Sequence, residues 1–145
     1  PRVGAMAVAA MIVVLLVKFA AIAALLEQAH SDLGLLLGGL LLIPMLARAG
    51  IIGLMATTSY VRKQGMVSDT QSAATKSKVM IMSAVLALLA LPLLQEKALL
   101  ILFVWLAVLV AYRAALKKRL GGYTGDTLGA AVEIQEAVLL VALAL

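Results

Sequence analysis

VGAMAVAAMIVVLLVKFAAIAALL, residues 3–26, is a run of apolar side chains that only Lys18 interrupts. A helix needs about 20 such residues, at about 1.5 Å each, to cross a hydrocarbon core of about 30 Å. The run is continuous and does not alternate with polar residues, so it favours a helix over a barrel strand. It is also too long for a cleavable signal peptide and has no small-residue cleavage site behind it. This stretch therefore predicts a membrane-spanning helix.

Four further apolar runs repeat the pattern, at residues 33–55, 79–94, 98–116 and 127–145. The run at 79–94 is shorter than a span requires, so we expect it to extend back through Ser77 and Lys78 or to pack inside the bundle. The expected fold class is an all-α integral membrane protein. It would form a polytopic bundle of about five transmembrane helices, in a single transmembrane domain over residues 1–145.

The composition supports this class and excludes several others. Of the 145 residues, 65% are hydrophobic and 13% are charged, and the mean hydropathy is +1.15. A soluble fold of this size could not bury so much apolar surface, which excludes a cytosolic domain or a disordered tail. The absence of cysteine excludes disulfides, thiolate zinc sites and cysteine nucleophiles. We attribute the net charge of +5 to basic loops and not to nucleic-acid binding.

Basic residues gather in alternate connectors between the predicted spans. The connector at 27–32 holds no Lys or Arg, whereas the loops at 56–78 and 117–126 hold most of the basic residues outside the spans. Lys and Arg are enriched in the cytoplasmic loops of membrane proteins. The loops at 56–78 and 117–126 are therefore expected to be cytoplasmic, and the C-terminus to lie on the far side.

Besides Arg113, near the end of the run at 98–116, four charged residues lie within predicted spans, where charge is costly and marks a bundle interior, a cavity or a partner. They are Lys18, Arg48, Glu133 and Glu136. Lys18 and Arg48 have long side chains that can snorkel to an interface, and for both this alternative stays open. Glu133 and Glu136 are too short to do so. For them the alternative to a functional role is a structural ion pair with Lys18 or Arg48.

The sequence GGYTGDTLGA, residues 121–130, connects a basic triplet to the last span. Glycines let a backbone approach an anion, and a helix N-terminus offers it unpaired N–H groups, so the segment is a candidate phosphate site. Asp126 or Thr127 acting as a helix N-cap is the alternative. Asp126, Glu133 and Glu136 also follow one helix face, where carboxylates suit Mg²⁺ and not zinc.

The same residues carry a resemblance to a known family. GGYTGDTLGA followed by Glu133 and Glu136 closely resembles the C-terminal motif of the bacterial cobalamin synthase family, the adenosylcobinamide-GDP ribazoletransferases. Arg2-Val3-Gly4-Ala5 leading to LLVKFAA at residues 15–21 is similar to the family's "RxGxxG … LLLKFAAL" span. Tyr60-Val61-Arg62 with Gly65-Met66 is similar to its "YAR…GLG" loop, and Arg48 stands where the family tends to carry an arginine.

The resemblance implies a multi-pass enzyme of the bacterial inner membrane that acts late in cobalamin (vitamin B12) biosynthesis. The implied activity joins adenosylcobinamide-GDP to α-ribazole, or its 5′-phosphate, with release of GMP and with Mg²⁺ as cofactor. By analogy the catalytic residues would be Asp126, Glu133 and Glu136, with Asp126 and Glu133 as metal ligands. Substrate phosphates would be bound by Lys18, Arg48, Arg62, Gly122, Thr124, Gly125 and Thr127.

The chain departs from the family in one respect. The family's aspartate-rich "DGxADxxDG" motif, the main metal site expected, has no counterpart here. The chain is therefore expected to be the C-terminal portion of a longer enzyme, inactive unless the missing N-terminal portion is supplied. Its expected partners are the corrinoid nucleotide, α-ribazole, the lipid bilayer and that missing portion. A homo-oligomer or other corrinoid-pathway enzymes are further expected partners, and nucleic acid is not.

Three other functions compete with this one. A membrane phosphotransferase of the CDP-alcohol type would carry several aspartates at fixed spacing on facing helices, which this chain lacks. A transporter or channel subunit would use Lys18, Glu133 and Glu136 as an ion or proton pathway. A structural membrane subunit would keep its function when Asp126 is replaced.

Overall fold

The computed structural model describes residues 4–29, 33–61 and 94–145, together with positions 77, 81, 84, 85, 88 and 92. These residues form four long helices and a short 3-10 helix. The long helices are α1 (Ala5–Gln28), α2 (Leu33–Thr57), α4 (Ala98–Leu120) and α5 (Gly125–Ala144), and the 3-10 helix is η2 (Gln95–Lys97). All four long helices are long and apolar enough to cross a membrane. The predicted class, an all-α protein with several membrane-spanning helices, is confirmed.

Within the residues that the structure describes there are four spans, and five were predicted over the whole chain. The third predicted span, 79–94, lies almost wholly outside the described residues, of which the isolated positions 81, 84, 85, 88 and 92 are helical. Most of the predicted loop 56–78, including Arg62, also lies outside them.

The predicted loop 117–126 is wrong at both ends. α4 continues through the basic triplet to Leu120, and α5 begins at Gly125. The last carbonyls of a helix carry partial negative charge and favour cations, so Lys117, Lys118 and Arg119 extend α4 instead of ending it. The connection between the two helices is only four residues long.

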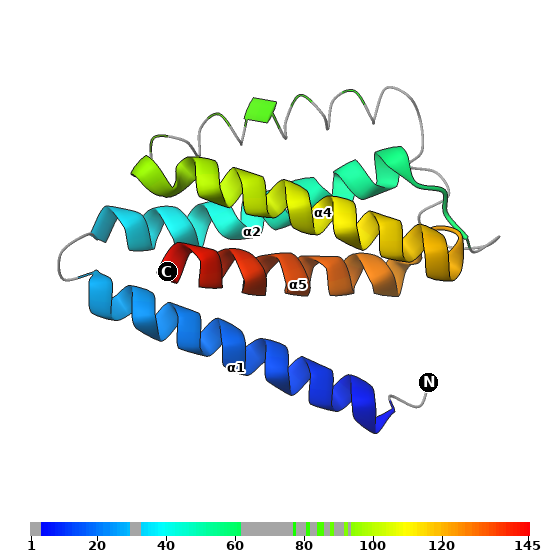
Figure 1. Cartoon of the computed structure of the whole chain (residues 1–145), viewed down its shortest axis with the longest axis horizontal. Helices are drawn as coiled ribbons and strands as arrows, with labels where there is room; N and C mark the ends of the chain where they lie inside the picture. Colours follow the sequence, from blue (N-terminus) through cyan, green and yellow to red (C-terminus); the bar gives the residue numbers. More distant parts are fainter. Residues whose placement is uncertain are drawn as a thin grey trace.

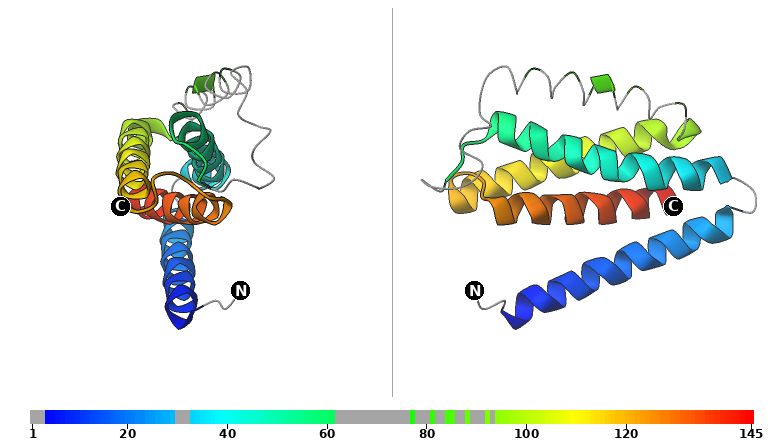
Figure 2. Two further views of the ribbon diagram at one scale, coloured as in Figure 1. Left: turned by 90° about the vertical axis from the view of Figure 1, so that its right-hand side faces the viewer. Right: turned by 180° about the vertical axis from the view of Figure 1, so that it is seen from behind.

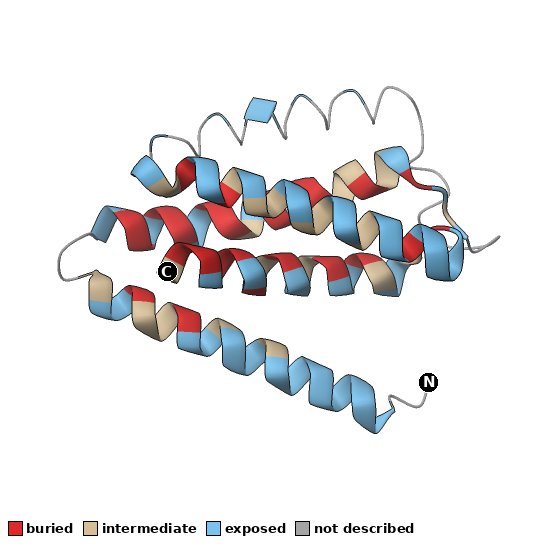
Figure 3. Ribbon diagram, viewed as in Figure 1, coloured by how far each residue is buried: buried red, intermediate tan, exposed pale blue. Residues whose placement is uncertain are grey.

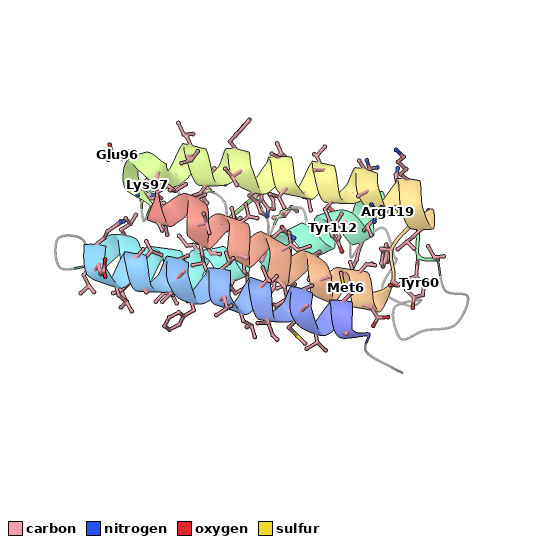
Figure 4. All side chains as sticks on the ribbon, turned by 60° about the horizontal axis from the view of Figure 1, so that its bottom comes forward. Met6, Tyr60, Glu96, Lys97, Tyr112 and Arg119 are labelled. Carbon is pink, nitrogen blue, oxygen red and sulfur yellow. The ribbon has the colours of Figure 1, made fainter. Side chains whose placement is uncertain are left out.

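α1 and α5 run in one direction, and α2 and α4 run in the opposite direction (Figure 1, Figure 2). The start of α1, the end of α2, the end of α4 and the start of α5 lie together at one end of the bundle. We call this the basic end, because it carries Lys117, Lys118 and Arg119. Figure 4 shows Tyr60 and Arg119 at the basic end, with Glu96 and Lys97 at the opposite end.

α5 is the central helix of the bundle and packs against α1, α2 and α4. Towards the opposite end it buries Leu139 and Leu143 against residues of α2 such as Ile43, and towards the basic end it buries Leu128 beside Leu54. Figure 3 shows the buried positions of α2 and α5 facing each other along their length. Because one face of α5 packs against α2, its remaining faces are the ones that meet α1 and α4.

α1 packs against α5 through its second half only. Ala21 and Leu25 are buried, whereas every residue from 4 to 13 is exposed. α1 diverges from α5 towards its N-terminus, and the separation widens towards the basic end (Figure 1). Residues 4–13 of α1 therefore make no buried contact within the described residues.

Candidate functional site

Three helices bring four charged side chains together midway along the bundle. Lys18 of α1 donates from Nζ to Glu133 Oε2 at 2.6 Å and to Glu136 Oε2 at 2.7 Å. Arg48 of α2 donates from Nη1 to Glu136 Oε1 at 3.3 Å and to the carbonyl oxygen of Pro44 at 2.9 Å. We call Lys18, Arg48, Glu133 and Glu136 the charge cluster.

Helix periodicity explains why one lysine reaches two acids. Glu133 and Glu136 are three residues apart on α5, so both lie on the face that meets α1. Lys18 is the fourteenth residue of α1, at the level where α1 begins to diverge, and its side chain turns towards α5. The ion pairs that the sequence left as one alternative are thus present in the structure.

Snorkelling, the other alternative for the two cations, is wrong. Lys18 is only 15% exposed and is held by both carboxylates, so it does not extend to an interface. Arg48 binds the carbonyl of Pro44, which precedes it by one turn of α2 and therefore lies farther from the basic end. A charge at the centre of a span costs about 2.5–3.5 kcal/mol on insertion scales, and pairing within the bundle offsets that cost.

The two acids are not equivalent. Glu136 is 16% exposed and receives hydrogen bonds from Lys18 and Arg48, whereas Glu133 is 54% exposed and receives one from Lys18. Glu136 is thus a structural junction between three helices. Glu133 is the member of the pair that a substrate or another protein segment can reach.

The second group of predicted site residues lies at the basic end, in the connection between α4 and α5. Gly121 ends α4 with a φ of 73°, a left-handed conformation that glycine adopts without strain. At Gly122 a Cβ atom would overlap the carbonyl oxygen of Ser59. Tyr123 donates its N–H to Ser59 at 2.9 Å, and Val61 donates to the carbonyl of Tyr123 at 3.1 Å. Gly122 therefore serves close packing of two chain segments, and a phosphate contact there remains a prediction.

Thr124 is the N-cap of α5, so the alternative interpretation, in which Asp126 or Thr127 caps the helix, is wrong. The Thr124 hydroxyl accepts from the Thr127 N–H at 3.3 Å, and the Thr127 hydroxyl accepts from the Thr124 N–H at 2.8 Å. Thr124 has an extended backbone, which leaves its side chain free to bend back onto the first turn. This reciprocal arrangement uses the amides of Thr124 and Thr127 and leaves those of Gly125 and Asp126 outside the capping box.

The start of α5 is accessible at the positions that a substrate would approach. Gly125 and Asp126 are exposed, and no atom lies within 4 Å of a Cβ built on Gly125 or Gly129. Asp126 stands in the first turn, where the helix dipole favours its negative charge. An anion and a carboxylate can thus both be accommodated at this helix end.

The predicted metal ligands Asp126 and Glu133 are separated along α5. Seven residues place them about 10 Å apart along the helix axis, on one exposed face. In the part of the chain that the structure describes, no three His, Asp or Glu side chains gather closely enough to hold a metal ion. Both ligand assignments remain predictions.

Several polar residues at this site escaped the sequence reasoning. Tyr112 of α4 donates its hydroxyl to the carbonyl of Thr127 at 2.7 Å, and Arg113 donates from Nη2 to the carbonyl of Thr57 at 2.9 Å. The rings of Tyr60 and Tyr123 pack at a centroid distance of 5.4 Å. The sequence could have pointed to these residues through its tyrosines, which lie near the ends of predicted spans. A buried tyrosine hydroxyl needs a hydrogen-bond partner.

The sequence profile of the cobalamin-5-phosphate synthase family matches residues 1–144. Curated relatives named adenosylcobinamide-GDP ribazoletransferase occur in Pseudomonas fluorescens, Pseudomonas aeruginosa and Pseudomonas paraeruginosa, and they are 40%, 42% and 43% identical over 151 aligned residues. Each alignment covers the whole of this chain. The chain spans 56–57% of the length of these relatives. No solved structure matches the chain.

Proposed function

Since the chain belongs to the cobalamin-5-phosphate synthase family, we propose that it is the C-terminal portion of an adenosylcobinamide-GDP ribazoletransferase. The whole protein would join adenosylcobinamide-GDP to α-ribazole, or to its 5′-phosphate, and release GMP. The observation that carries this proposal is the similarity to ribazoletransferases along the entire chain, at 40–43% identity in three of them.

The reaction we propose is a phosphoryl transfer. A hydroxyl oxygen of the ribazole forms a bond to the phosphorus that carries the corrinoid, and the bond from that phosphorus to the bridging pyrophosphate oxygen breaks. GMP leaves with the bridging oxygen, and the hydroxyl proton passes to a carboxylate. Such a reaction depends on cations at the pyrophosphate and on a positioned nucleophile.

The basic end supplies groups suited to the pyrophosphate. The amides of Gly125 and Asp126 lie at a helix N-terminus, which attracts anions, and Thr124 and Thr127 border it. Lys117, Lys118 and Arg119 raise the local positive potential. Arg62 follows Val61, which is hydrogen-bonded to Tyr123, so we assign it to the same phosphate site.

Exposed carboxylates on α5 fit a magnesium ion in their chemistry. Asp126 offers oxygen ligands next to the proposed pyrophosphate site, and Glu133 lies further along α5 with one of its oxygens bound to Lys18. When bound, Mg²⁺ would neutralise charge on the phosphates. Other ligands would come from the phosphates and from the part of the enzyme outside this chain.

The charge cluster would support the reaction from within the membrane. Asp126, next to the proposed pyrophosphate site, is the carboxylate we assign to the ribazole hydroxyl, and Glu133, about 10 Å away along α5, would help to hold Lys18 in place. Glu136 would contribute by holding Lys18 and Arg48, whose positive charges offset the negative charge of the substrate phosphates.

We place the protein in the bacterial inner membrane with its basic end in the cytoplasm, where nucleotide substrates occur.

The test is turnover by the full-length enzyme in detergent or liposomes, with Mg²⁺ and adenosylcobinamide-GDP and with or without α-ribazole phosphate. We expect corrinoid product and GMP only with the ribazole, and a loss of about 100-fold in Asp126→Asn because a charged ligand of the proposed Mg²⁺ beside the phosphates is removed. Glu96→Gln, at the opposite end, is the matched control and should keep full activity.

Two results would change the proposal. Full activity in Asp126→Asn would reduce Asp126 to a stabiliser of the start of α5. Absence of turnover by a folded full-length protein would contradict the transferase and favour a transport role for the charge cluster.

A further inference from the structure

Charged side chains of this chain face outward in the middle of the bundle. Glu133 is 54% exposed and Arg48 is 64% exposed, although both are paired. Glu133 lies eight residues from the start of α5 and eleven from its end, which is about 12 Å and 16 Å along the axis. Both charges therefore lie near the centre of a hydrocarbon core of about 30 Å.

Lipid acyl chains cannot solvate the exposed charges of Glu133 and Arg48. Charged groups at this depth face a bundle interior or another polar group and not acyl chains. Neither side chain escapes to an interface, since Lys18 holds Glu133 and Arg48 turns towards Pro44, away from the basic end. Some polar component must therefore lie against Glu133 and Arg48.

The neighbouring surfaces are shaped to receive a helix. Gly129 and Ala130 lie one turn before Glu133 on α5, both exposed, and small residues allow helices to approach closely in membranes. Across from them, residues 4–13 of α1 are exposed on every side, and α1 diverges from α5 (Figure 1). The described residues leave both of these facing surfaces uncovered.

The length of the relatives supports an occupant from outside this chain. The chain accounts for only 56–57% of their length, so a large portion of the full-length protein lies outside it. We propose that a transmembrane helix from that portion packs between the first half of α1 and the first half of α5. It would present a hydrogen-bond donor or cation to Glu133 and an acceptor or carboxylate to Arg48. The inference rests on family membership and not on the proposed reaction.

Photo-crosslinking in the full-length protein tests this packing. A photoreactive amino acid replaces Ala130, and a protease site is introduced immediately before residue 1. The matched control carries the same amino acid at Ala115 of α4, which is also an exposed alanine. Both alanines lie five residues from the end of their helix at the basic end.

After irradiation in membranes and cleavage, we expect the Ala130 probe to keep the two fragments joined, with a yield at least fivefold above that of the Ala115 probe. A second probe at Met11, in the exposed half of α1, should give the same joined product. Because no turnover is measured, the result is independent of the proposed activity.

Three outcomes would overturn the proposal. Equal yields from Ala130 and Ala115 would show no preference for the proposed surface. Adducts with lipid alone at both Ala130 and Met11 would mean that acyl chains cover it. A product of twice the protein mass would identify a second copy of the protein as the occupant.

Discussion

Glu136 is the residue on which the packing of three helices converges. It accepts hydrogen bonds from Lys18 of α1 and from Arg48 of α2 while standing on α5. Its side chain is largely buried, so the loss of its charge would leave two cations with a single, more exposed carboxylate. Removing one partner from a buried ion pair is far more destabilising than removing an exposed one.

We therefore predict that Glu136→Gln destabilises the protein more than Glu133→Gln does. The expected losses are about 3 kcal/mol for Glu136→Gln and about 1 kcal/mol or less for Glu133→Gln. Thermal unfolding of the full-length protein in detergent measures both. Equal shifts in the unfolding temperature would contradict the unequal roles of the two acids.

At this scale the sequence indicated which residues mattered but not how they pair. Lys18, Arg48, Glu133 and Glu136 stood out because charge is rare in apolar spans. Periodicity places residues on a face of their own helix, but it does not say which helix lies opposite. The pairs follow from the packing of α1 and α2 on α5, which only the structure shows.

Close packing of α2 on α5 depends on glycines of α2. A Cβ at Gly50 would overlap the side-chain amide of Gln135, and one at Gly39 would overlap Leu143. Gln135 is buried, donates to the carbonyl of Ala131 at 3.0 Å, and was not among the predicted site residues. A polar residue at a helix interface therefore lies directly against the backbone of its neighbour.

We predict that Gly50→Ala destabilises the protein by about 1–3 kcal/mol, because the added methyl group displaces Gln135. The matched control is Gly53→Ala on the same helix. Its Cβ would meet only Leu109 at 3.6 Å, an ordinary contact, so the change should be neutral or slightly stabilising. Chemical unfolding of both variants in mixed micelles makes the comparison. A Gly50→Ala variant as stable as the control would contradict the close packing.

Helix ends were predicted less well than helices. Apolar runs located α1, α2, α4 and α5, because burial in lipid requires long apolar segments. Their ends depend on capping and on backbone conformation, as the left-handed Gly121 and the capping box at Thr124 show. A hydropathy pattern contains neither feature, and for this reason the predicted loop 117–126 was too long at both ends.

For the whole molecule, α4 ends and α5 begins at the basic end, because these two helices run in opposite directions. Lys117, Lys118 and Arg119 share that end with the start of α1 and the end of α2, as the distribution of charge suggested. The charge cluster, by contrast, joins residues far apart in the sequence, and no local pattern could have placed it.

We predict that the basic end faces the cytoplasm. This chain contains no cysteine, so Arg119→Cys and Glu96→Cys each introduce a single reporter, at opposite ends of the bundle (Figure 4). In the full-length protein, with any other cysteine replaced, a membrane-impermeant maleimide should label Glu96→Cys in intact spheroplasts. Arg119→Cys should react only after lysis. The reverse pattern would invert the proposed orientation.

The ion pairs between α1 and α5 also bear on how the protein is made. Lys18 and its two carboxylate partners are separated by 115 and 118 residues, so the lysine leaves the ribosome long before the acids do. During synthesis the lysine of α1 therefore has neither carboxylate partner until α5 has been made. Nascent chains that end before α5 would present an orphan lysine in the bilayer, a feature by which membrane proteases and chaperones can recognise incomplete products.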